Sequence, residues 1–420
     1  MPNFSFVHAA DLHLDSPFAT LHVDNPDLAR ILRSATFEAF DRVVQLCLDK
    51  QVDFLLVAGD VYDGADRSLR AQVKFRDGLQ RLDEAGIRSF VVHGNHDPLE
   101  GWSSTLEWPS GVHVFGDHAE TVELRKDGTL LACVQGISYP QRDERRNLSL
   151  LFHRTSPAFR IALLHANVGS DTGHEPYAPC SLEDLLKSEM DYWALGHVHS
   201  KRVLSDHSPF VVYPGNPQGR NIKETGEKGC YLVRVGDDKE VEMEFHTTDV
   251  IRWDTYDLPI HDLQTEQDLM NALEHLCLGI SEKASGRPAM ARISLPGRSP
   301  LFKFLKAPNS LPDLLEILHE MGSSYSPPVW VEQIQLGVGP DIDPLVRMKE
   351  RDFLGDLIRY SRELLGEKHL GALVREDLAP LFESASIHRY LDSPGDRKLR
   401  ELLEEAERIC LENLHGEEAP

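Results

Sequence analysis

The sequence predicts an α/β fold in which a β-sandwich flanked by helices is followed by a small α+β domain and a helical C-terminal tail. First, short apolar runs such as DFLLVAG and SFVVHG alternate with stretches of helical period at residues 34–50 and 68–85. Second, the later runs, from VHVFG to GCYLVRV, follow one another closely with turn residues between them, which indicates a second sheet packed on the first. Third, apolar residues recur at helical spacing towards the C-terminus.

The length of the chain, 420 residues, exceeds one ordinary hydrophobic core, so we expect several domains. The α/β pattern ends near residue 250 and defines a region 1–250. Residues 251–338 combine a helical stretch at 264–279 with the strand-like runs ARISL and VWVEQIQL, which predicts a small α+β domain. Residues 339–420 form the helical region.

The composition excludes several function classes. The net charge of −24 argues against a protein that holds nucleic acid by general electrostatics, so a polyanion-binding surface would be local, metal-assisted or supplied by a partner. Six scattered cysteines without a CxxC pair argue against a disulfide framework and a thiolate zinc site. The N-terminus lacks the basic and apolar segments of a signal peptide, and no run is long enough to span a bilayer, so we expect a cytoplasmic protein.

Five apolar runs end in side chains that can bind metal. These side chains are Asp11 and His13, then Asp60, then Asn95 with His96 and Asp97, then His165, and finally His197 and His199. Ligand sites of α/β sheets lie outside the carboxyl ends of the strands, so residues far apart in sequence can converge there. Residues two apart in an extended segment project to the same side. The pair Asp11 and His13 and the pair His197 and His199 can therefore each bind one ion. Glycines before Asp60, Asn95 and His197 let the backbone turn and approach the ion closely.

The number and type of these side chains predict two metal ions. Seven of these nine side chains, all except His96 and Asp97, are the candidate ligands, and seven exceed the three or four of a single tetrahedral catalytic site. Imidazole, carboxylate and amide ligands without thiolate favour manganese, iron or zinc. Two close ions need a shared carboxylate, and we expect Asp60 to be this bridge. A single histidine at a strand end is more often structural, so the prediction depends on five junctions occurring together.

In this order, the motifs DxH, GD, GNHD, H and GHxH resemble those of the calcineurin-like metallophosphoesterases, and among them the SbcD-type DNA repair nucleases. The stretch YPGNPQGRNIKETGEKGCYLV is typical of that nuclease branch, and the opening HAADLHLDSPF with the helical tail resembles the YhaO-type members. The resemblance is strong over residues 5–250 and extends to the rest by layout. It implies a metallophosphoesterase β-sandwich with a capping domain.

The resemblance also implies roles for individual residues. It assigns Asp11, His13, Asp60 and His199 to a first ion, and Asp60, Asn95, His165 and His197 to a second. His96 matches a catalytic histidine near the scissile phosphate, whose tautomer Asp97 would fix; orienting the phosphate is the simpler alternative for His96. Asp63 lies where some relatives carry a histidine near the phosphate, so it is a candidate for substrate binding.

The implied activity is hydrolysis of DNA phosphodiesters by a water that two ions, with manganese favoured, activate as hydroxide. The protein would be the exonuclease and endonuclease subunit of a repair complex with an SMC-like (SbcC/YhaN-type) coiled-coil ATPase, and relatives dimerise. GxxxxGK(S/T) does not occur in the sequence, so ATP would be bound by the partner. One alternative is a phosphodiesterase or phosphatase acting on nucleotides or phosphoproteins, and another is a scaffold that recruits the ATPase.

Two further stretches are candidates for macromolecular contacts. Residues 283–306 carry six basic residues and no acid, which could follow a phosphate backbone; the alternative is a solvated hairpin. The candidate contacts are Arg287, Arg292, Arg298, Lys303 and Lys306. The apolar stripe at 399–414 could dock on the ATPase, although such stripes more often pack within their own domain.

Overall fold

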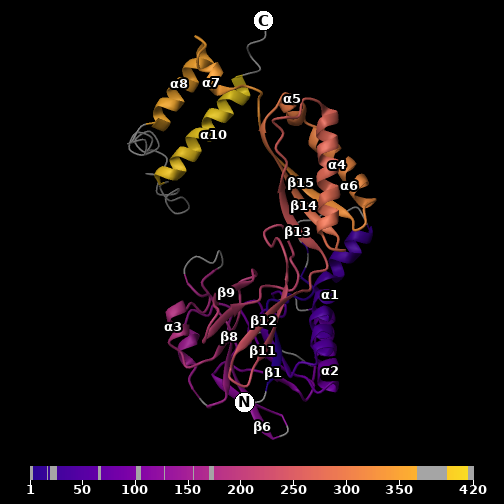
Figure 1. The fold of residues 1–420 in the computed structure, drawn as a ribbon, viewed down its shortest axis with the longest axis vertical. Helices are drawn as coiled ribbons and strands as arrows, with labels where there is room; N and C mark the ends of the chain where they lie inside the picture. Colours follow the sequence, from indigo (N-terminus) through magenta and orange to yellow (C-terminus); the bar gives the residue numbers. More distant parts are fainter. Residues whose placement is uncertain are drawn as a thin grey trace. The chain divides into compact units, whose positions relative to one another are not determined.

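The computed structural model describes residues 3–16, 18, 26–64, 68–100, 106–126, 128–154, 156–169, 175–366 and 395–414. The chain divides into two compact units (Figure 1). The first unit comprises residues 1–254 with the short segments 284–290 and 326–328, and the second holds the remaining residues. The three regions expected from the sequence stay a prediction, since the two units group the helical tail with most of the middle region.

The first unit contains two six-stranded mixed sheets. The first sheet has the order β12-β11-β1-β2-β3-β4. Its strands are β1 (Phe4–Ala9), β2 (Phe54–Ala58), β3 (Arg88–Val92), β4 (Val112–Val114), β11 (Gly229–Val235) and β12 (Val241–Thr247). Strands β1, β2 and β3 run parallel, so their carboxyl ends meet at one edge. Strand β2, FLLVA, is buried along its whole length, as expected for a parallel strand covered on both faces.

The second sheet has the order β5-β6-β7-β8-β10-β9. Its strands are β5 (Glu120–Lys126), β6 (Thr129–Ile137), β7 (Phe159–His165), β8 (Tyr192–Gly196), β9 (Arg202–Ser205) and β10 (Phe210–Tyr213). Strands β6, β7 and β8 are parallel neighbours. One hydrophobic cluster contains residues of both sheets, including Phe6 and Phe54 of the first and Phe159 and Tyr192 of the second. The two sheets therefore pack face to face as a sandwich.

Helices cover the outer faces of this sandwich. Helices α1 (Pro26–Lys50) and α2 (Leu69–Glu84) pack on the first sheet, where the rings of Phe40 and Phe75 lie 5.3 Å apart. The short helices α3 (Leu182–Leu186) and η1 (Leu148–Leu151) contribute to the cluster on the second sheet. The predicted helical stretches at 34–50 and 68–85 fall within α1 and on α2, and Ser68 caps α2 by accepting from the Ala71 N–H. The predicted helix-flanked β-sandwich is confirmed.

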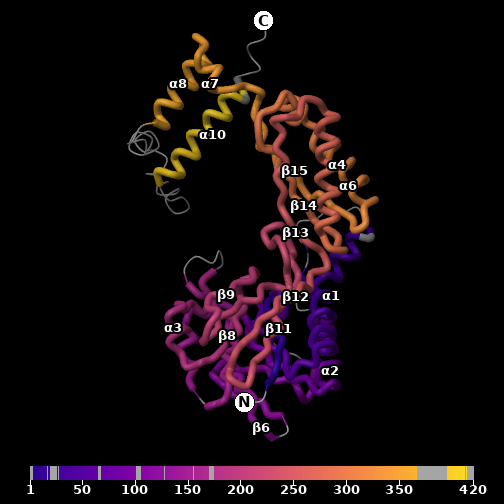
Figure 2. Tube along the Cα trace, in the orientation of Figure 1, coloured from indigo at the N-terminus to yellow at the C-terminus, as the bar shows by residue number. Residues whose placement is uncertain are grey.

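The second unit is built around the three-stranded sheet β13-β14-β15. Its elements are β13 (Arg252–Asp257), α4 (Glu266–Lys283), β14 (Ala289–Arg298), α5 (Phe302–Lys306), α6 (Ser310–Ser323), β15 (Val329–Gly339), α7 (Pro344–Arg347), α8 (Phe353–Gly366) and α10 (Asp396–Leu414). Helices α4 and α6 contact each other and β15 (Figure 2). The α+β arrangement and the helical tail agree with the predicted fold class.

Helices α8 and α10 lie side by side in the tail (Figure 2). Leu354, Ile358 and Leu411 form a small buried cluster between them. Leu399, from the predicted stripe, is buried as well, whereas Leu402 is 44% exposed. Part of the stripe is thus buried within its own unit, and part of it is exposed. Among the described residues, no helix combines the length and apolar character that a membrane span requires.

Candidate metal centre

The predicted ligands from the ends of five strands come together at the carboxyl-end edge of the sandwich. They follow β1, β2 and β3 of the first sheet and β8 of the second, and His165 is the last residue of β7. Nε2 of His13 lies 3.2 Å from Nε2 of His199. His165 lies 3.4 Å from Asp60 through Nε2 and 3.8 Å from Asp11 through Nδ1. Residues up to 188 positions apart in the sequence, such as Asp11 and His199, therefore share one buried cluster.

Three overlapping groups of side chains could hold a metal ion: two contain Asp11, and the third consists of His13, Asp63 and His96. Asp11, His13 and His199 offer ligand atoms that all lie within 4.8 Å of one another, and so do Asp11, Asp60 and His165. The Oδ2 atom of Asp60 lies 3.9 Å from Nε2 of His13 and 3.4 Å from Nε2 of His165. Asp60 thus lies between His13 of one Asp11-containing group and His165 of the other, which is the position that a bridging carboxylate needs.

Asn95 and His197 complete the predicted set at the side of His165. Oδ1 of Asn95 is 3.1 Å from Nε2 of His165, and the rings of His197 and His165 lie 5.2 Å apart. The backbone N–H of His197 donates to Asp11, and its Nε2 contacts the carbonyl oxygen of Glu175 at 2.9 Å. If Nε2 carries the proton of that contact, Nδ1 is the nitrogen that can act as a ligand.

Hydrogen bonds also orient two other imidazoles towards the cluster. Nδ1 of His165 donates to the carbonyl oxygen of Ala58 at 3.0 Å, and Nδ1 of His199 donates to Oε1 of Glu224 at 2.7 Å. In both rings the Nε2 lone pair then faces the cluster. An imidazole that donates its other N–H to a carbonyl or carboxylate is the usual arrangement of a metal-binding histidine.

The backbone around the cluster holds rare conformations. Asp11, His13, Asp60 and His197 have φ values of 52°, 43°, 50° and 103°, in the left-handed region that residues with a side chain seldom adopt. Each such residue costs of order 1–3 kcal/mol, and such strain gathers at functional sites. Four of the seven predicted ligands therefore lie in backbone conformations that the surrounding fold must enforce.

Three glycines make room for the ring of His165. A Cβ added at Gly59, whose φ is +86°, would lie 2.4 Å from Nδ1 of His165, and one at Gly94 would lie 2.3 Å from Oδ1 of Asp60. A Cβ at Gly196 would lie 1.8 Å from the carbonyl oxygen of Ala58. These glycines thus allow close packing around His165, and the predicted approach to an ion stays a prediction.

Replacing Gly196 with alanine should lower the free energy of unfolding of the first unit by about 1–3 kcal/mol or more, because the methyl group meets backbone on the neighbouring strand β2 and cannot be relieved by a side-chain rotation. Urea unfolding followed by circular dichroism measures this change. Gly116→Ala is the matched control, since its Cβ would meet nothing closer than the His118 ring at 3.5 Å. Its effect should stay below about 1 kcal/mol, and equal losses in the two variants would contradict the close packing.

The electrostatics of the cluster fit divalent cations. Burial and the neighbouring Asp60 raise the pKa of Asp11 well above its usual range. Burial, together with Arg220 and His199, holds the pKa of His13 well below its usual range, and burial lowers the pKa of His199 as well. The imidazoles are thus available as neutral ligands, while the crowded carboxylates lack compensating charge. Cations relieve such crowding, and the mixed nitrogen and oxygen donors suit manganese, iron or zinc.

His96 lies at the rim of the cluster, where 33% of its side chain is exposed. Its Nδ1 donates to Oδ1 of Asp63 at 2.7 Å, and its backbone N–H donates to Oδ1 of Asp60 at 2.9 Å. Burial lowers the pKa of His96, but the hydrogen bond to Asp63 and the charges of Asp60 and Asp63 outweigh burial and raise this pKa above its usual value. His96 is therefore positioned where a substrate could reach it.

The predicted contact between Asp97 and His96 is wrong. Asp97 is fully buried, and its carboxylate accepts from the backbone N–H groups of Gly94 and Val61 at 2.7 and 2.9 Å. Its Oδ2 also lies 3.2 Å from Nδ1 of His93. The chain turns after Gly94 so that this carboxylate lies beneath the loop and binds its backbone, and Asp63 takes the place at His96.

Two residues of the site were missed by the analysis of the sequence. Arg220 lies against Asp63 at 3.1 Å and Glu224 at 3.2 Å, and Glu224 holds His199. Both belong to the stretch YPGNPQGRNIKETGEKGCYLV, which had served only to indicate the family. Charged residues four positions apart are expected to pair on a helix, but outside a helix their spacing predicts nothing. The sequence therefore provided no reason to assign Arg220 and Glu224 to the site.

The arginines of the basic stretch have partners within their own units. Arg287 donates to the carbonyl oxygen of Asp249 at 2.8 Å, Arg292 to Oε1 of Glu332 at 2.6 Å, and Arg298 to the carbonyl oxygen of Ile342 at 2.7 Å. Lys303 and Lys306 are exposed on or at the end of α5. Contact of this stretch with DNA stays a prediction, and any phosphate would have to share the three arginines with these partners.

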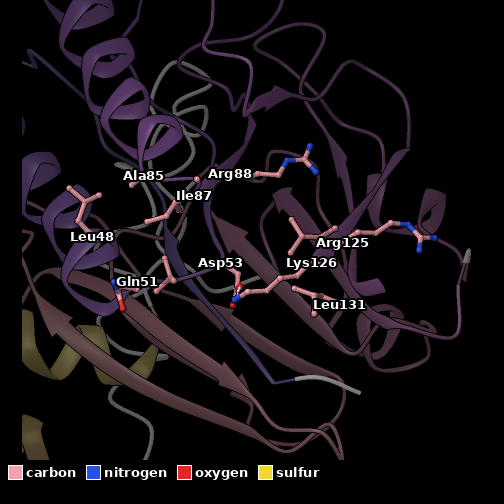
Figure 3. A pocket seen from close by; sticks show the side chains of 12 residues that line it. Leu48, Gln51, Asp53, Ala85, Ile87, Arg88, Arg125, Lys126 and Leu131 are labelled. Carbon is pink, nitrogen blue, oxygen red and sulfur yellow. Dashed lines mark hydrogen bonds and ion pairs between the residues drawn. The ribbon is translucent and has the colours of Figure 1, made fainter. Parts of the chain in front are cut away.

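A cavity of about 340 Å³ lies at the other end of the first sheet (Figure 3). Asp53, which precedes β2, and Arg88, the first residue of β3, help to line it. Lys126 also lines it and reaches Asp53 at 2.7 Å. The predicted ligands follow the opposite ends of β2 and β3, so this cavity is not part of the metal centre.

Comparison with known proteins relates the chain to phosphoesterases. Residues 4–201 match the family described as calcineurin-like phosphoesterase, and residues 253–339 match the middle domain of metallophosphoesterase YhaO. The chain is 35% identical over 401 residues to a protein of Bacillus subtilis (strain 168) described as uncharacterized metallophosphoesterase YhaO, covering 92% of this chain and 97% of that protein.

More distant similarity reaches proteins named for DNA repair or nuclease activity. The DNA double-strand break repair protein Mre11 of Aeropyrum pernix is 28% identical over 260 residues, which cover 56% of this chain and 59% of Mre11. One of the subunits of the nuclease SbcCD from Bacillus subtilis (strain 168) is 27% identical over 257 residues, which cover 52% of this chain and 63% of that protein. The chain thus aligns with less than two thirds of these two relatives.

Proposed function

Because the chain belongs to the calcineurin-like phosphoesterase family, whose members hydrolyse phosphoesters, we propose that it is a metal-dependent DNA nuclease. The observation that carries the proposal is that side chains able to bind metal, from the ends of five strands, converge on one buried edge of the sandwich. The choice of DNA is supported by similarity to a protein named as part of a nuclease and to one named for double-strand break repair.

The proposed ligands divide between two ions around Asp60. They are Asp11, His13, Asp60 and His199 for the first ion, and Asp60, Asn95, His165 and His197 for the second. Manganese is the metal we favour, since the donor set contains imidazole, carboxylate and amide groups without thiolate. When bound, two such ions would supply a water of lowered pKa and neutralise charge on the phosphate.

His96 supplies the remaining group that the reaction needs. A deoxyribose oxygen is a poor leaving group, so a proton donated as the P–O bond breaks lowers the barrier. Asp63 holds the Nδ1–H of His96 at 2.7 Å, so the proton given to the leaving oxygen is the second one, on Nε2 of the protonated and part-exposed ring, a form that the raised pKa of His96 favours. Asp63 is accordingly a positioning residue in this proposal. Asp97 shapes the loop that carries Asn95 and His96.

The helical tail exposes apolar side chains that could bind a partner chain. Leu345 and Val346 of α7 and Phe353 and Tyr360 of α8 are 57–67% exposed. Exposed apolar side chains at this density mark surfaces for protein contacts. An SMC-like coiled-coil ATPase is the partner that we propose, because the nuclease relative is named as one part of a larger complex. A homodimer stays a prediction.

Two observations favour a second candidate, a phosphodiesterase of small esters or nucleotides. The net charge is −24, and the three arginines of the basic stretch are engaged by internal partners. Both weaken general attraction to DNA.

Cleavage of end-labelled duplex and single-stranded DNA, compared with hydrolysis of bis(4-nitrophenyl) phosphate, separates the two candidates. Each reaction is run with Mn²⁺ and with EDTA. Degradation of DNA that EDTA stops supports the nuclease. Hydrolysis of the small ester with no attack on DNA, alone or with a coexpressed partner ATPase, would favour the second candidate and overturn the first.

Metal binding should also be visible in stability. At a free Mn²⁺ concentration of 100 times Kd, each occupied site adds about 2.7 kcal/mol to the free energy of unfolding. Thermal unfolding followed by circular dichroism should therefore shift upwards with Mn²⁺ and return to its starting point with EDTA. Ca²⁺ is the matched control, because it prefers all-oxygen sites and should produce a smaller shift. Equal shifts with both ions would contradict the proposed ligand set.

A further inference from the structure

An unbroken chain of contacts joins the two sides of the metal centre. It runs from His96 to Asp63, from Asp63 to Arg220, from Arg220 to Glu224, and from Glu224 to His199. The four links measure 2.7, 3.1, 3.2 and 2.7 Å. Each imidazole at an end of the chain meets its carboxylate through Nδ1, so in both rings Nε2 faces away from the chain.

Arg220 holds the middle of this chain with both arms of its guanidinium. Nη1 donates to Oδ2 of Asp63, and Nη2 donates to Oε1 of Glu224. The side chain is only 12% exposed, so water screens these ion pairs poorly. A planar fork with two separate donor ends can hold two carboxylates at once, whereas the single ammonium of lysine cannot reproduce that geometry.

Neighbouring groups hold both carboxylates in the same places. Ser16 Oγ donates to Oδ2 of Asp63 at 2.6 Å. Oε2 of Glu224 accepts from Nδ2 of Asn216 at 2.9 Å and from the backbone N–H of Arg220 at 2.7 Å. The hydrogen bond from His96 is the main reason why the pKa of Asp63 lies well below its usual range. Although burial raises the pKa of Glu224, His199 and Arg220 hold it well below its usual value.

We propose that Arg220 is the positioning residue that couples the substrate side of the site, at His96, to the metal side, at His199, through Asp63 and Glu224. This inference rests on the proposed function. Arg220 fixes the two carboxylates, and each carboxylate holds the Nδ1–H of its ring. Nε2 is then directed towards substrate in His96 and towards the metal in His199. A change at Arg220 should thus affect metal affinity and turnover together.

Three single variants test the coupling, with Mn²⁺ affinity measured by titration calorimetry and kcat measured on bis(4-nitrophenyl) phosphate. Asp63→Asn should lower kcat about 10-fold or more and change Mn²⁺ affinity little. Glu224→Gln should weaken Mn²⁺ binding about 10-fold to 100-fold, the usual effect of losing the partner of a metal-binding histidine. Arg220→Met should lower both quantities. Adding Arg220→Met to either other variant should cost less than the product of the separate effects.

Arg160→Met is the matched control for loss of a buried arginine. Arg160 is 14% exposed and pairs with Asp191 at 2.8 Å, at the start of β7 and thus at the opposite end of that strand from His165. It should lower the midpoint of thermal unfolding without changing Mn²⁺ affinity or kcat. Arg220→Lys keeps the charge and serves as the second variant if Arg220→Met does not fold. In Arg220→Lys, either Mn²⁺ affinity or kcat should still fall about 10-fold.

A readout in the metal-free protein separates this inference from the proposed function. In ¹⁵N spectra of the histidine rings, the signals of His96 and His199 should both change in Arg220→Met and neither should change in Arg160→Met. Wild-type protein that neither binds Mn²⁺ nor hydrolyses the ester would end the proposed function, and these spectra would still decide the coupling. Unchanged ring signals, or wild-type affinity and kcat in both Arg220 variants, would overturn the inference.

Discussion

Replacing Asp60 with alanine should lower phosphodiester hydrolysis at least about 10³-fold, because an ion that polarises a phosphoryl oxygen contributes several kcal/mol to the transition state. Asp60 is 1% exposed, and its Oδ2 lies 3.9 Å from His13 and 3.4 Å from His165. In the proposed site it is the one residue that binds both ions. Its Oδ1 also accepts the backbone N–H of His96, so the variant loosens the loop that carries this histidine.

The measurement combines turnover on DNA and on bis(4-nitrophenyl) phosphate with the number of Mn²⁺ ions bound per chain. Asp53→Ala is a close control, because Asp53 flanks the other end of the same strand β2, pairs with Lys126 and accepts the Ser5 N–H. It should cost some stability and leave turnover and metal content unchanged. Turnover of Asp60→Ala within about 3-fold of wild type would mean that the activity comes from another site or a contaminant.

The sequence predicted the layers of the first unit because local pattern and global fold agree there. Buried parallel strands read as continuous apolar runs, and each run ends where the backbone must turn. The metal-binding edge followed from the same rule, since side chains after neighbouring parallel strands meet whatever the length of the connections between them. His165 and Asp11 lie on different sheets, and they are 3.8 Å apart because the two sheets also pack face to face.

Contacts that depend on how a loop closes were beyond the same reasoning. Asp97 follows His96 directly, and the resemblance to the family implied that Asp97 fixes the tautomer of this ring. The turn after Gly94 instead directs the Asp97 carboxylate to two backbone N–H groups. Asp63, which comes from the loop after β2, then reaches His96. Backbone N–H groups in a buried loop need hydrogen-bond acceptors, and the Asp97 carboxylate is positioned to accept from two of them.

Arg220 and Glu224 show a second limit. Their roles arise only when the segment after β10 is folded against the loop of His199, and no periodicity marks that approach. The basic stretch shows a third limit: its run of cations suggested contact with phosphates, which stays a prediction, and the sequence did not reveal that Arg292 and Arg298 have partners in distant parts of the same unit. Net charge along a sequence does not record which charges the fold will neutralise.

Replacing His96 with glutamine should lower kcat for DNA by about 10²–10⁴-fold, the usual contribution of a general acid or base, while Mn²⁺ affinity stays within about 3-fold of wild type. The ring is 33% exposed at the rim and is not among the proposed ligands, although His96 forms a third group with His13 and Asp63 that could hold a metal ion. Glutamine retains a polar side chain but cannot donate a proton to a leaving oxygen. His118→Gln, at a side chain that is 76% exposed on the surface, is the control and should leave kcat unchanged.

The leaving group distinguishes proton donation from simple orientation of the phosphate by His96. The deoxyribose oxygen of DNA needs a proton as the P–O bond breaks, whereas 4-nitrophenolate is stable without one. If His96 donates the proton, His96→Gln should impair DNA cleavage at least about 10-fold more than hydrolysis of bis(4-nitrophenyl) phosphate. Equal losses on both substrates would assign His96 to orientation. In either case Asp63→Asn should show the same pattern of losses in a weaker form, because Asp63 binds the ring at Nδ1 and acts on substrate only through it.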